Sequence, residues 1–350
     1  MGSHRNYPFN CWWVAAASEE VSYRPLCRWL LERRVVLFRT AQGSAVALED
    51  RCAHRWAPLS KGKVIGDEIA CPYHGFRYNV RGTCTHVPTQ THIPAALKVR
   101  SYPVREHGPF VWIWMGNAAH ADPALLPSIQ EFTDPAYFQV HGYFGEAHCN
   151  YMLIHENVLD VTHIEHLHAG TVHVEGLQRP PEVTVKSHSV TYSFDTPEVP
   201  LDPLLSTPMG LEAGQRVRQR AWGSFVSPAC HYSGIDIENT RPAKGQRVQY
   251  CFRGLHCVTP IGPHRCHYWW ANAQDYGREG ADLVAHLRAG AEAIYQQDRS
   301  VVESIQETIE RDEGGNTPEI LVAADRAAVE ARRIVDRLVK TEDRIIESST

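Results

Sequence analysis

The stretch Cys52–Phe76, CAHRWAPLSKGKVIGDEIACPYHGF, contains two short pairs of the same two residue types. In the first pair Cys52 stands two residues before His54, and in the second Cys71 stands three residues before His74. Each pair therefore offers one thiolate and one imidazole within the span of a tight turn. Because both groups are ligands for soft and borderline metals, the stretch predicts a metal site.

Two kinds of metal site use two cysteines and two histidines. Tetrahedral zinc accepts this set, but zinc fingers mostly pair cysteine with cysteine and histidine with histidine. A mixed pair suits a cluster of two irons, in which both sulfurs bind one iron and both imidazoles bind the other. The spacing Cys-x-His, sixteen residues, Cys-x-x-His resembles the signature of such a Rieske [2Fe–2S] centre. We therefore predict a Rieske cluster, with zinc as the alternative.

The remaining residues of this stretch are those expected in two loops folded over a cluster. Pro58 and Pro72 stiffen the chain, while Gly62, Gly66 and Gly75 permit tight turns and close backbone approach.

The length and composition of the chain limit the classes of protein to which it can belong. A length of 350 residues favours about two domains, and 43% hydrophobic with 21% charged residues is typical of globular proteins. The net charge of −5 gives no basic footprint for nucleic acid. The longest apolar run, residues 11–17, is far shorter than the roughly 20 residues of a membrane helix. We expect neither a nucleic acid nor a membrane as a partner.

The ten cysteines indicate the compartment. Apart from the two in the metal stretch they are scattered without a framework, as expected of reduced thiols. The first residues, 1–4, contain no apolar signal region. We therefore expect a cytoplasmic protein.

Periodicity and turn signals divide the chain into two parts. Residues 1–116 are predicted to form the iron–sulfur domain, because residues 8–116 contain short β-rich pieces and a hairpin signal at Gln42-Gly43. Residues 117–135 are punctuated by prolines and are predicted to be a linker. Residues 136–350 are predicted to be the catalytic domain.

The second part combines strands with long helices. Strands are predicted within 183–194, 245–260 and 265–274, and helices at 154–168, 281–310 and 318–340, the last beginning with Pro318 in its first turn. This order favours an α+β fold in which helices cover one face of a sheet.

A second group of candidate ligands lies in residues 150–170, NYMLIHENVLDVTHIEHLHAG. Asn157, Asp160 and His163 are spaced by three and share one face of a helix. His168 lies about 140° from His163 on an ideal helix, so the two can meet only if the helix ends or distorts. Ala169-Gly170 is a candidate terminator. His166 would pair with His163 more easily on a straight helix, and geometry alone leaves this choice open.

Two histidines and one carboxylate form the facial triad of non-haem iron oxygenases, which leaves open positions for oxygen and substrate. The predicted helix at 281–310 offers four candidate carboxylates, and spacing does not choose among them. These are Glu292, Asp298, Glu303 and Glu307.

Together, these motifs resemble the oxygenase component of the Rieske non-haem iron oxygenases over nearly the whole chain. The pieces CWWVAAASEE, VVLFR, AHRWAPLSKG, CPYHGF and QQDRSVVESIQ are most similar to the branch that includes vanillate O-demethylase and dicamba monooxygenase. Two departures are small: Ala53 stands where a proline is frequent, and His155-Glu156 where the branch often has an acid.

The resemblance implies a fold and a ligand set. It implies an N-terminal all-β Rieske domain and a C-terminal helix-grip (Bet v 1-like) domain whose sheet cups iron and substrate. The implied cluster ligands are Cys52, His54, Cys71 and His74. The implied ligands of a mononuclear Fe(II) are His163, His168 and Asp298, with Asn157 in the same motif. Asp160 matches the acid that couples the centres by accepting hydrogen bonds from His163 and from His74 of a neighbouring subunit.

The resemblance also implies an activity and partners. A monooxygenase of this kind uses O2 to hydroxylate, or to O- or N-demethylate, a small aromatic substrate. Its electrons come from a separate flavin or iron–sulfur reductase, with or without a ferredoxin, and it forms a homotrimer. Alternatives are a ring cis-dihydroxylating dioxygenase and a Rieske electron-transfer protein without its own chemistry. Within and near the catalytic sheet, His231, Tyr232 and His267 are candidate substrate contacts.

Overall fold

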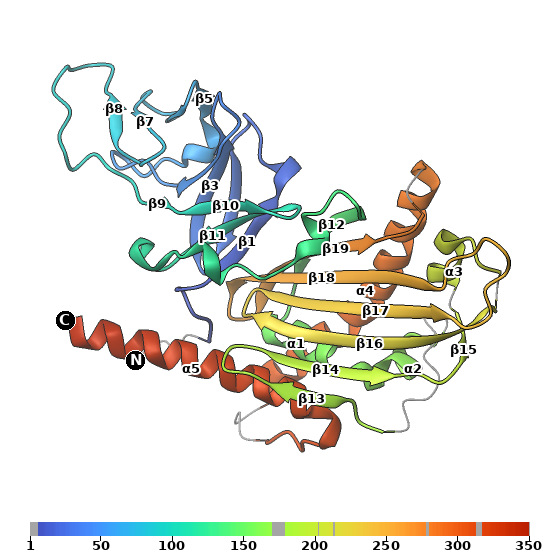
Figure 1. Ribbon diagram of the computed structural model, residues 1–350. Helices are drawn as coiled ribbons and strands as arrows, with labels where there is room; N and C mark the ends of the chain where they lie inside the picture. The colour runs from blue at the N-terminus through green and yellow to red at the C-terminus, as the bar shows by residue number, and fades with distance from the viewer. Residues whose placement is uncertain are drawn as a thin grey trace. The chain divides into compact units, whose positions relative to one another are not determined.

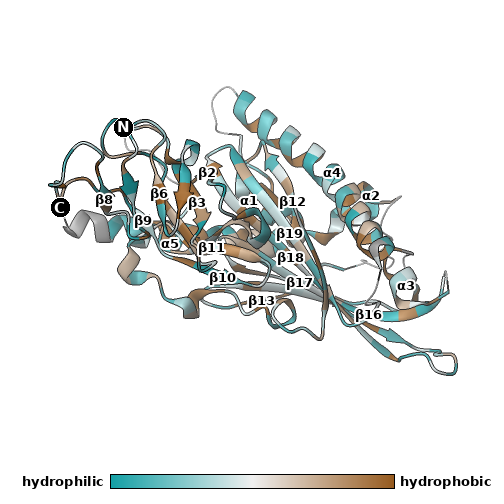
Figure 2. Ribbon diagram, turned by 90° about the horizontal axis from the view of Figure 1, so that it is seen from above, coloured by the Kyte–Doolittle hydropathy of each residue, from teal (hydrophilic) through white to brown (hydrophobic). Residues whose placement is uncertain are grey.

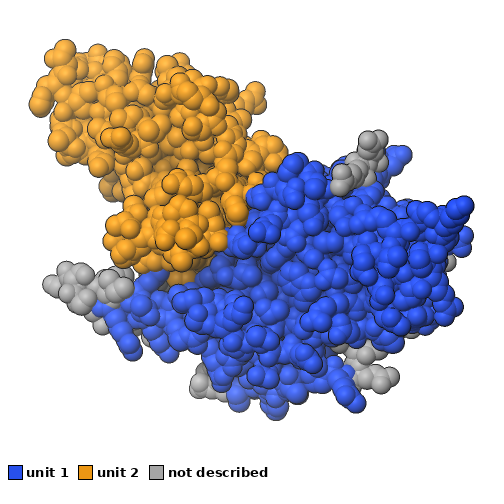
Figure 3. Space-filling view, in the orientation of Figure 1, with its two compact units in different colours: residues 1–6, 127–258, 263–350 blue, residues 7–126, 259–262 orange. Residues whose placement is uncertain are grey.

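The computed structural model describes residues 6–169, 179–201, 203–212, 214–277, 280–312 and 317–349. The chain forms two compact units (Figure 3). We call Tyr7–Leu126 with Thr259–Gly262 the N-terminal unit, and the remainder, chiefly Pro127–Val258 and Pro263–Thr350, the C-terminal unit. The boundary between the two functional domains, predicted to lie in the linker at 117–135, stays a prediction.

The N-terminal unit is built of short antiparallel strands in three sheets. Their orders are β1-β11-β10, β2-β3-β4-β9 and β5-β6-β7-β8. The strands are β1 (Trp12–Ala17), β2 (Leu26–Leu30), β3 (Arg33–Arg39), β4 (Ala45–Glu49), β5 (Lys63–Ile65), β6 (Glu68–Ala70), β7 (Arg77–Tyr78), β8 (Cys84–His86), β9 (Ser101–Tyr102), β10 (Val104–His107) and β11 (Phe110–Trp114). The predicted hairpin at Gln42-Gly43 is confirmed: Gly43 adopts φ +83° and its N–H donates to the carbonyl of Thr40 at 2.9 Å.

The candidate cluster ligands lie above one hydrophobic core of the N-terminal unit. Val36, Phe38 and Leu48 from β3 and β4 pack in the same cluster of buried side chains as Cys52 and Cys71. Apolar residues of strands β3 and β4 therefore pack in the same core as the cysteines of both candidate cluster loops.

The C-terminal unit is centred on a large antiparallel sheet of eight strands, seven of them in the order β12-β19-β18-β17-β16-β14-β13 and β15 beside β16 (Figure 1). The strands are β12 (Phe138–Ala147), β13 (Glu182–Val185), β14 (Val190–Asp195), β15 (Val199–Pro200), β16 (Arg216–Ser227), β17 (Cys230–Asn239), β18 (Gln249–Gly262) and β19 (Arg265–Gln274). Strands predicted within 183–194, 245–260 and 265–274 are confirmed, whereas β12, β16 and β17 were not predicted.

Helices cover this sheet on the side of the candidate triad. They are α1 (Tyr151–Leu159), α2 (Ile164–Leu167), α3 (Pro203–Met209), α4 (Ala281–Arg311) and α5 (Arg326–Ser349). α1 packs on β16, α4 on β12 and α5 on β14, and α1 also contacts both α4 and α5. Figure 2 shows polar and apolar colours alternating along α4, as expected of a helix with one face on a sheet. Of the helices in the described ranges, none has the length and hydropathy of a membrane span.

Two of the predicted helices differ from the observed ones. The predicted helix at 154–168 is interrupted, because α1 ends at Leu159 and α2 begins only at Ile164. The predicted helix at 318–340 begins instead at Arg326, after a single 3-10 turn at Ala323–Asp325. The Asp325 carboxylate accepts a hydrogen bond from the N–H of Val322 at 2.6 Å, which fixes this later start. The predicted helix at 281–310 is confirmed by α4.

Candidate metal centres and substrate cavity

The four candidate cluster ligands divide by exposure. Cys52 and Cys71 are buried, with 1% and 4% of their surface exposed, whereas His54 and His74 are exposed. The rings of His54 and His74 lie 4.8 Å apart between centroids, and Phe76 stacks on His54 at 4.7 Å. Two inner sulfurs and two outer imidazoles are the division that a Rieske cluster requires, so the donor set fits that cofactor.

Hydrogen-bond donors surround the two sulfurs. The N–H of Ala53 donates to the Tyr78 hydroxyl at 3.1 Å, which leaves the hydroxyl proton to point at the Cys52 sulfur 3.2 Å away. Burial raises the pKa of the Cys71 thiol, while the backbone N–H groups of Tyr73 and His74 lower it. Hydrogen bonds to cluster sulfurs tune the reduction potential. Sequence reasoning missed Tyr78, which lies 26 residues from Cys52.

The loop between the two ligand pairs is fixed by a buried acid and a glycine. The Asp50 carboxylate accepts hydrogen bonds from the N–H and the hydroxyl of Ser60, at 2.6 and 2.7 Å, and pairs with Arg34 at 3.0 Å. A Cβ atom on Gly62 would lie 1.9 Å from the carbonyl oxygen of Ala70, so only glycine fits there. The predicted close backbone approach is confirmed at this glycine.

The second candidate centre depends on the break between α1 and α2. At Asp160 the backbone leaves the helix, with φ −105° and ψ 96°, and one 3-10 turn follows at Val161–His163. The Asp160 carboxylate stabilises that turn by accepting from the N–H and the hydroxyl of Thr162, at 2.9 and 2.6 Å. α2 then ends one residue before His168. The predicted terminator Ala169-Gly170 includes Gly170, which lies outside the described residues.

This break brings His163 and His168 together and adds a carboxylate from α4. The two imidazole rings lie 5.1 Å apart between centroids. Oδ1 of Asp298 is 3.4 Å from Nε2 of His163 and 3.1 Å from Nε2 of His168. Ligand atoms of the three residues all lie within 4.8 Å of one another. Two imidazole nitrogens and one carboxylate oxygen are the donor set of a mononuclear iron site, so the residues present fit that metal.

The alternatives that sequence spacing left open are placed elsewhere. His166 is exposed on α2. The competing carboxylates each bind another group: Glu292 accepts from Gln296, Glu303 from the N–H of His148 and from Arg299, and Glu307 pairs with Arg311.

Each histidine of the triad has its other ring nitrogen occupied. Nδ1 of His163 donates to the backbone carbonyl of Asp160, and Nδ1 of His168 donates to Oε1 of Gln297 at 2.7 Å. Both Nε2 atoms therefore face Asp298, and they are the ring nitrogens that would bind a metal there once their protons are displaced. The expectation that the Asp160 carboxylate accepts from His163 is wrong, because its backbone carbonyl does so while Thr162 occupies Oδ1 of its carboxylate.

The carboxylate of the triad is also oriented. Nδ2 of Asn157 donates to Oδ1 of Asp298 at 3.0 Å. Burial would raise the pKa of Asp298, but hydrogen bonds from His163 and His168 outweigh burial and hold it well below its usual range. Asp298 is therefore ionised at neutral pH, as a metal ligand must be.

A cavity of about 280 Å³ lies between the helices and the sheet, and the triad residues form part of its wall. The rest of the wall is mainly apolar and aromatic. It includes Phe144, Val161, Ile164, Leu204, Phe252 and Trp270.

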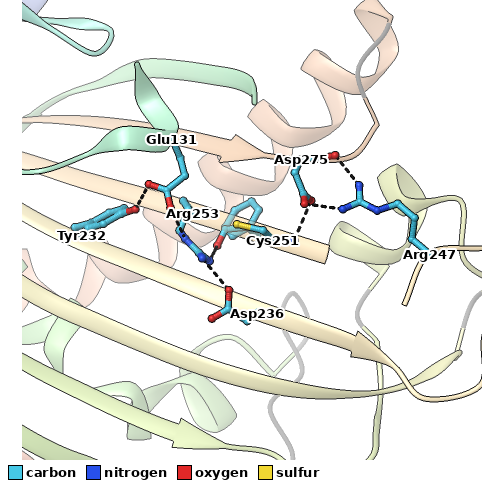
Figure 4. A network of polar contacts seen from close by, with 8 residues as sticks. Glu131, Tyr232, Asp236, Arg247, Cys251, Arg253 and Asp275 are labelled. Atoms are coloured by element: carbon cyan, nitrogen blue, oxygen red, sulfur yellow. Dashed lines mark hydrogen bonds and ion pairs between the residues drawn. The ribbon is translucent and has the colours of Figure 1, made fainter. Parts of the chain in front are cut away.

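The three candidate substrate contacts fall on two sides of the sheet. His231 lines the cavity, but Tyr232 and His267 do not. Successive side chains of a strand alternate between faces, so neighbours in sequence separate in this way. Tyr232 lies on the opposite face, where its hydroxyl donates to Glu131 at 2.5 Å; Glu131 in turn pairs with Arg253 (Figure 4). His267 instead hydrogen-bonds the hydroxyl of Tyr143 at 2.7 Å.

Comparison with known proteins agrees with both centres. Residues 11–103 match the Rieske [2Fe-2S] domain, and residues 147–341 match the vanillate O-demethylase oxygenase C-terminal domain. The chain is 33% identical to the dicamba O-demethylase oxygenase component of Stenotrophomonas maltophilia, over 95% of this chain and 98% of that one. It is 30% identical to the chloroacetanilide N-alkylformylase oxygenase component of Rhizorhabdus wittichii, over 96% of each.

Solved structures give the same result. Dicamba monooxygenase bound to 3,6-dichlorosalicylic acid superposes with a TM-score of 0.88 at 31% identity, over 95% of this chain and 98% of that one. The α+β fold with an N-terminal Rieske domain and a C-terminal catalytic domain is thereby confirmed. A simple electron carrier is excluded, because the match includes the catalytic domain. The chain belongs to the Rieske non-haem iron oxygenases of the vanillate O-demethylase type, and is the oxygenase component of a monooxygenase system with a [2Fe–2S] cluster and a mononuclear iron.

Proposed function

We propose that this oxygenase removes a methyl or other small alkyl group from oxygen or nitrogen of a one-ring aromatic substrate. The observation that carries the proposal is the position of His163, His168 and Asp298 in the wall of a largely apolar cavity. The names of its relatives, an O-demethylase and an N-alkylformylase, support dealkylation.

The two iron centres have proposed ligands from this chain. Cys52 and Cys71 hold the inner iron of the cluster and His54 and His74 the outer one. A second set, His163, His168 and Asp298, holds the mononuclear iron. When bound, these groups supply electron transfer and O2 activation for attack on a C–H bond.

The residues around the triad act by position and by excluding water. Asn157 fixes the orientation of Asp298, and Gln297 fixes the ring of His168. Apolar side chains such as Ile164 and Phe252 line the cavity. They hold the aromatic ring of the substrate close to the three proposed iron ligands in the same wall. We propose that Asp160 couples electron transfer from the cluster to the mononuclear iron. It stands three residues before the proposed iron ligand His163 in the sequence.

The relatives are oxygenase components, so a separate reductase component supplies electrons and the substrate is a small molecule. We propose that this reductase is of the flavin or iron–sulfur type, with or without a ferredoxin. We also propose a homotrimer in the cytoplasm. A heterologous contact that closes on itself forms such a ring.

Formaldehyde release tests the proposed reaction. Iron-loaded protein is mixed with a surrogate reductase, NADH, O2 and a panel of methoxy- and N-methyl-substituted aromatics. We expect formaldehyde in step with the demethylated product, and none from His163→Ala. A cis-diol with no formaldehyde would instead support the ring dioxygenase alternative.

A further inference from the structure

Part of the cavity wall comes from the short helix α3, which packs on α4 (Figure 2). Leu204 and Leu205 of α3 line the cavity, as do Leu287 and Ile294 of α4. The proposed iron ligand Asp298 follows on α4, one turn after Ile294. The way in which α3 rests on α4 therefore helps to set the shape of the cavity in which the triad lies.

Pro208 leaves α3 with a carbonyl group that the helix itself cannot use. In an α-helix the carbonyl of Leu204 accepts from the N–H four residues later, but that residue is Pro208, which has no N–H. Nε2 of His286 on α4 lies 3.2 Å from this carbonyl oxygen. Because a carbonyl oxygen only accepts, Nε2 carries the proton and donates it. A hydrogen bond from α4 thus replaces one that α3 lacks, and it holds the first turn of α3 on α4.

Gly290 stands one turn after His286 on the same face of α4. A Cβ atom placed on this glycine would lie 2.3 Å from Cδ1, 3.2 Å from Cδ2 and 3.3 Å from Cγ of Leu204. The Leu204 side chain therefore occupies the space that a larger residue at position 290 would need. Glycine inside a helix is destabilising relative to alanine, so what glycine adds at this position is room for Leu204.

We propose that His286 and Gly290, which we call the α4 notch, position α3, and that Leu204, seated in this notch, limits the size of the substrate. In the described part of the chain neither residue of the notch lines the cavity, so both act through Leu204, which does. This inference rests on the proposed function in one respect, because it takes the cavity as the substrate site.

The volume of the cavity gives the direction of the expected preference. A protein cavity of about 150 Å³ is enough to bind benzene. The cavity here, at about 280 Å³, suits one substituted ring. We therefore expect the wild type to bind a one-ring ligand more tightly than a two-ring ligand with the same substituents. Leu204→Ala shortens the side chain that closes this part of the wall, so it should favour the two-ring ligand.

Two matched ligand pairs test the size limit. In one pair 4-methoxyphenol is compared with 6-methoxy-2-naphthol, and in the other 4-methoxybenzoate with 6-methoxy-2-naphthoate. Binding to the cluster-containing, iron-loaded protein is measured by anaerobic calorimetry. We expect a wild-type preference of about tenfold for the one-ring member of at least one pair, and a reduction of about fivefold in Leu204→Ala. An unchanged preference in Leu204→Ala, or binding of no member to the wild type at millimolar concentration, would overturn the proposal.

A double-mutant cycle tests whether Gly290 acts through Leu204. Gly290→Ala places a methyl group in the notch, so Leu204 has to leave it, and binding of the one-ring ligand should weaken by about threefold or more. In the Leu204→Ala background the same change meets no leucine and should leave binding nearly unaltered. The visible cluster spectrum and the iron content should be those of the wild type in every variant. Equal effects of Gly290→Ala in the two backgrounds would contradict the role of the notch.

The hydrogen bond from His286 is tested by two replacements. His286→Leu removes the donor to the Leu204 carbonyl and should reduce the one-ring preference, whereas His286→Gln keeps an N–H donor and should restore most of it. Leu211→Ala is the matched control, because Leu211 packs in a core with Leu205 but does not line the cavity. Its preference should equal that of the wild type. Equal preferences in His286→Leu and the wild type would remove His286 from the proposal.

The two levels of proposal fail differently. If the variants shift the size preference as expected but no methoxy compound releases formaldehyde during turnover, the notch stands and the dealkylation proposal fails. If formaldehyde is released and the size preference is the same in all variants, dealkylation stands and the notch fails.

Discussion

The Nδ1–H of His168 determines which ring nitrogen faces Asp298. Its acceptor is Oε1 of Gln297, at 2.7 Å. Gln297→Leu removes this acceptor, and loss of such outer partners typically costs about 10–100-fold in metal affinity. We expect that loss in an Fe(II) competition titration. The neighbouring Gln296 bonds only to Glu292 on the same helix among the contacts described, so Gln296→Leu should keep wild-type affinity. Equal affinity in the two variants would remove the positioning role of Gln297.

Asp298 is the carboxylate that the two histidines share, so its removal should affect only the mononuclear site. We expect Asp298→Ala to keep the visible spectrum of the cluster and to lose most of the mononuclear iron. Glu303, which accepts from the N–H of His148, offers a matched change on the same helix. Should Glu303→Ala empty the site while Asp298→Ala does not, the assignment of the third ligand is wrong.

The charge of Asp160 can be removed without removing its structural bonds. Asn at this position keeps an oxygen that can accept from Thr162, as Oδ1 of Asp160 does at 2.9 and 2.6 Å. We therefore expect Asp160→Asn to keep the fold, the cluster and nearly full iron, yet to lose most turnover. In a single-turnover experiment its reduced cluster should stay reduced after addition of substrate and O2. Rapid reoxidation, as in wild type, would show that Asp160 does not couple the centres.

The break between α1 and α2 is the feature that sequence periodicity could not supply. The spacing of Asn157, Asp160 and His163 fits a continuous helix, and on such a helix His166 would compete with His168 as a ligand. The break depends on the Asp160 carboxylate, which accepts hydrogen bonds from the N–H and the hydroxyl of Thr162. The side chain thereby competes with the helix backbone for these hydrogen bonds. The resemblance to a family indicated the pair that the structure brings together with Asp298, while geometry from sequence alone did not.

α1 is also joined to α5 by an ion pair between Glu156 and Arg332. The carboxylate of Glu156 accepts two hydrogen bonds from Arg332, one of them 2.6 Å long, and the side chains are 15% and 39% exposed. Arg332→Met leaves the mostly buried Glu156 without its partner, and we expect a loss of about 2 kcal/mol in the free energy of unfolding.

The adjacent Arg333 is the control for this ion pair. It is 63% exposed and pairs with Glu330 on its own helix, so Arg333→Met should cost less than about 0.5 kcal/mol. Denaturant unfolding of both variants measures the difference. Equal stability of the two would show that the Glu156–Arg332 pair does not hold α1 on α5.

At the scale of the whole molecule, the features set by a short motif could be predicted from the sequence. The features set by packing between distant segments could not. The Rieske cluster and its candidate ligands were indicated by short spacings, because each Cys–His pair is local. The central strands β16 and β17 were missed, and with them the alternation that places His231 in the cavity and Tyr232 outside it.

The central claim is that one chain holds two separate iron centres, and iron quantified per chain tests it most directly. We expect about three iron atoms and two sulfides in the wild type, since a cluster and a mononuclear site are both present. His163→Ala should retain about two irons with an unchanged cluster spectrum, and His74→Ala should lose the cluster spectrum. A wild type with about two irons, unchanged in His163→Ala, would contradict the account.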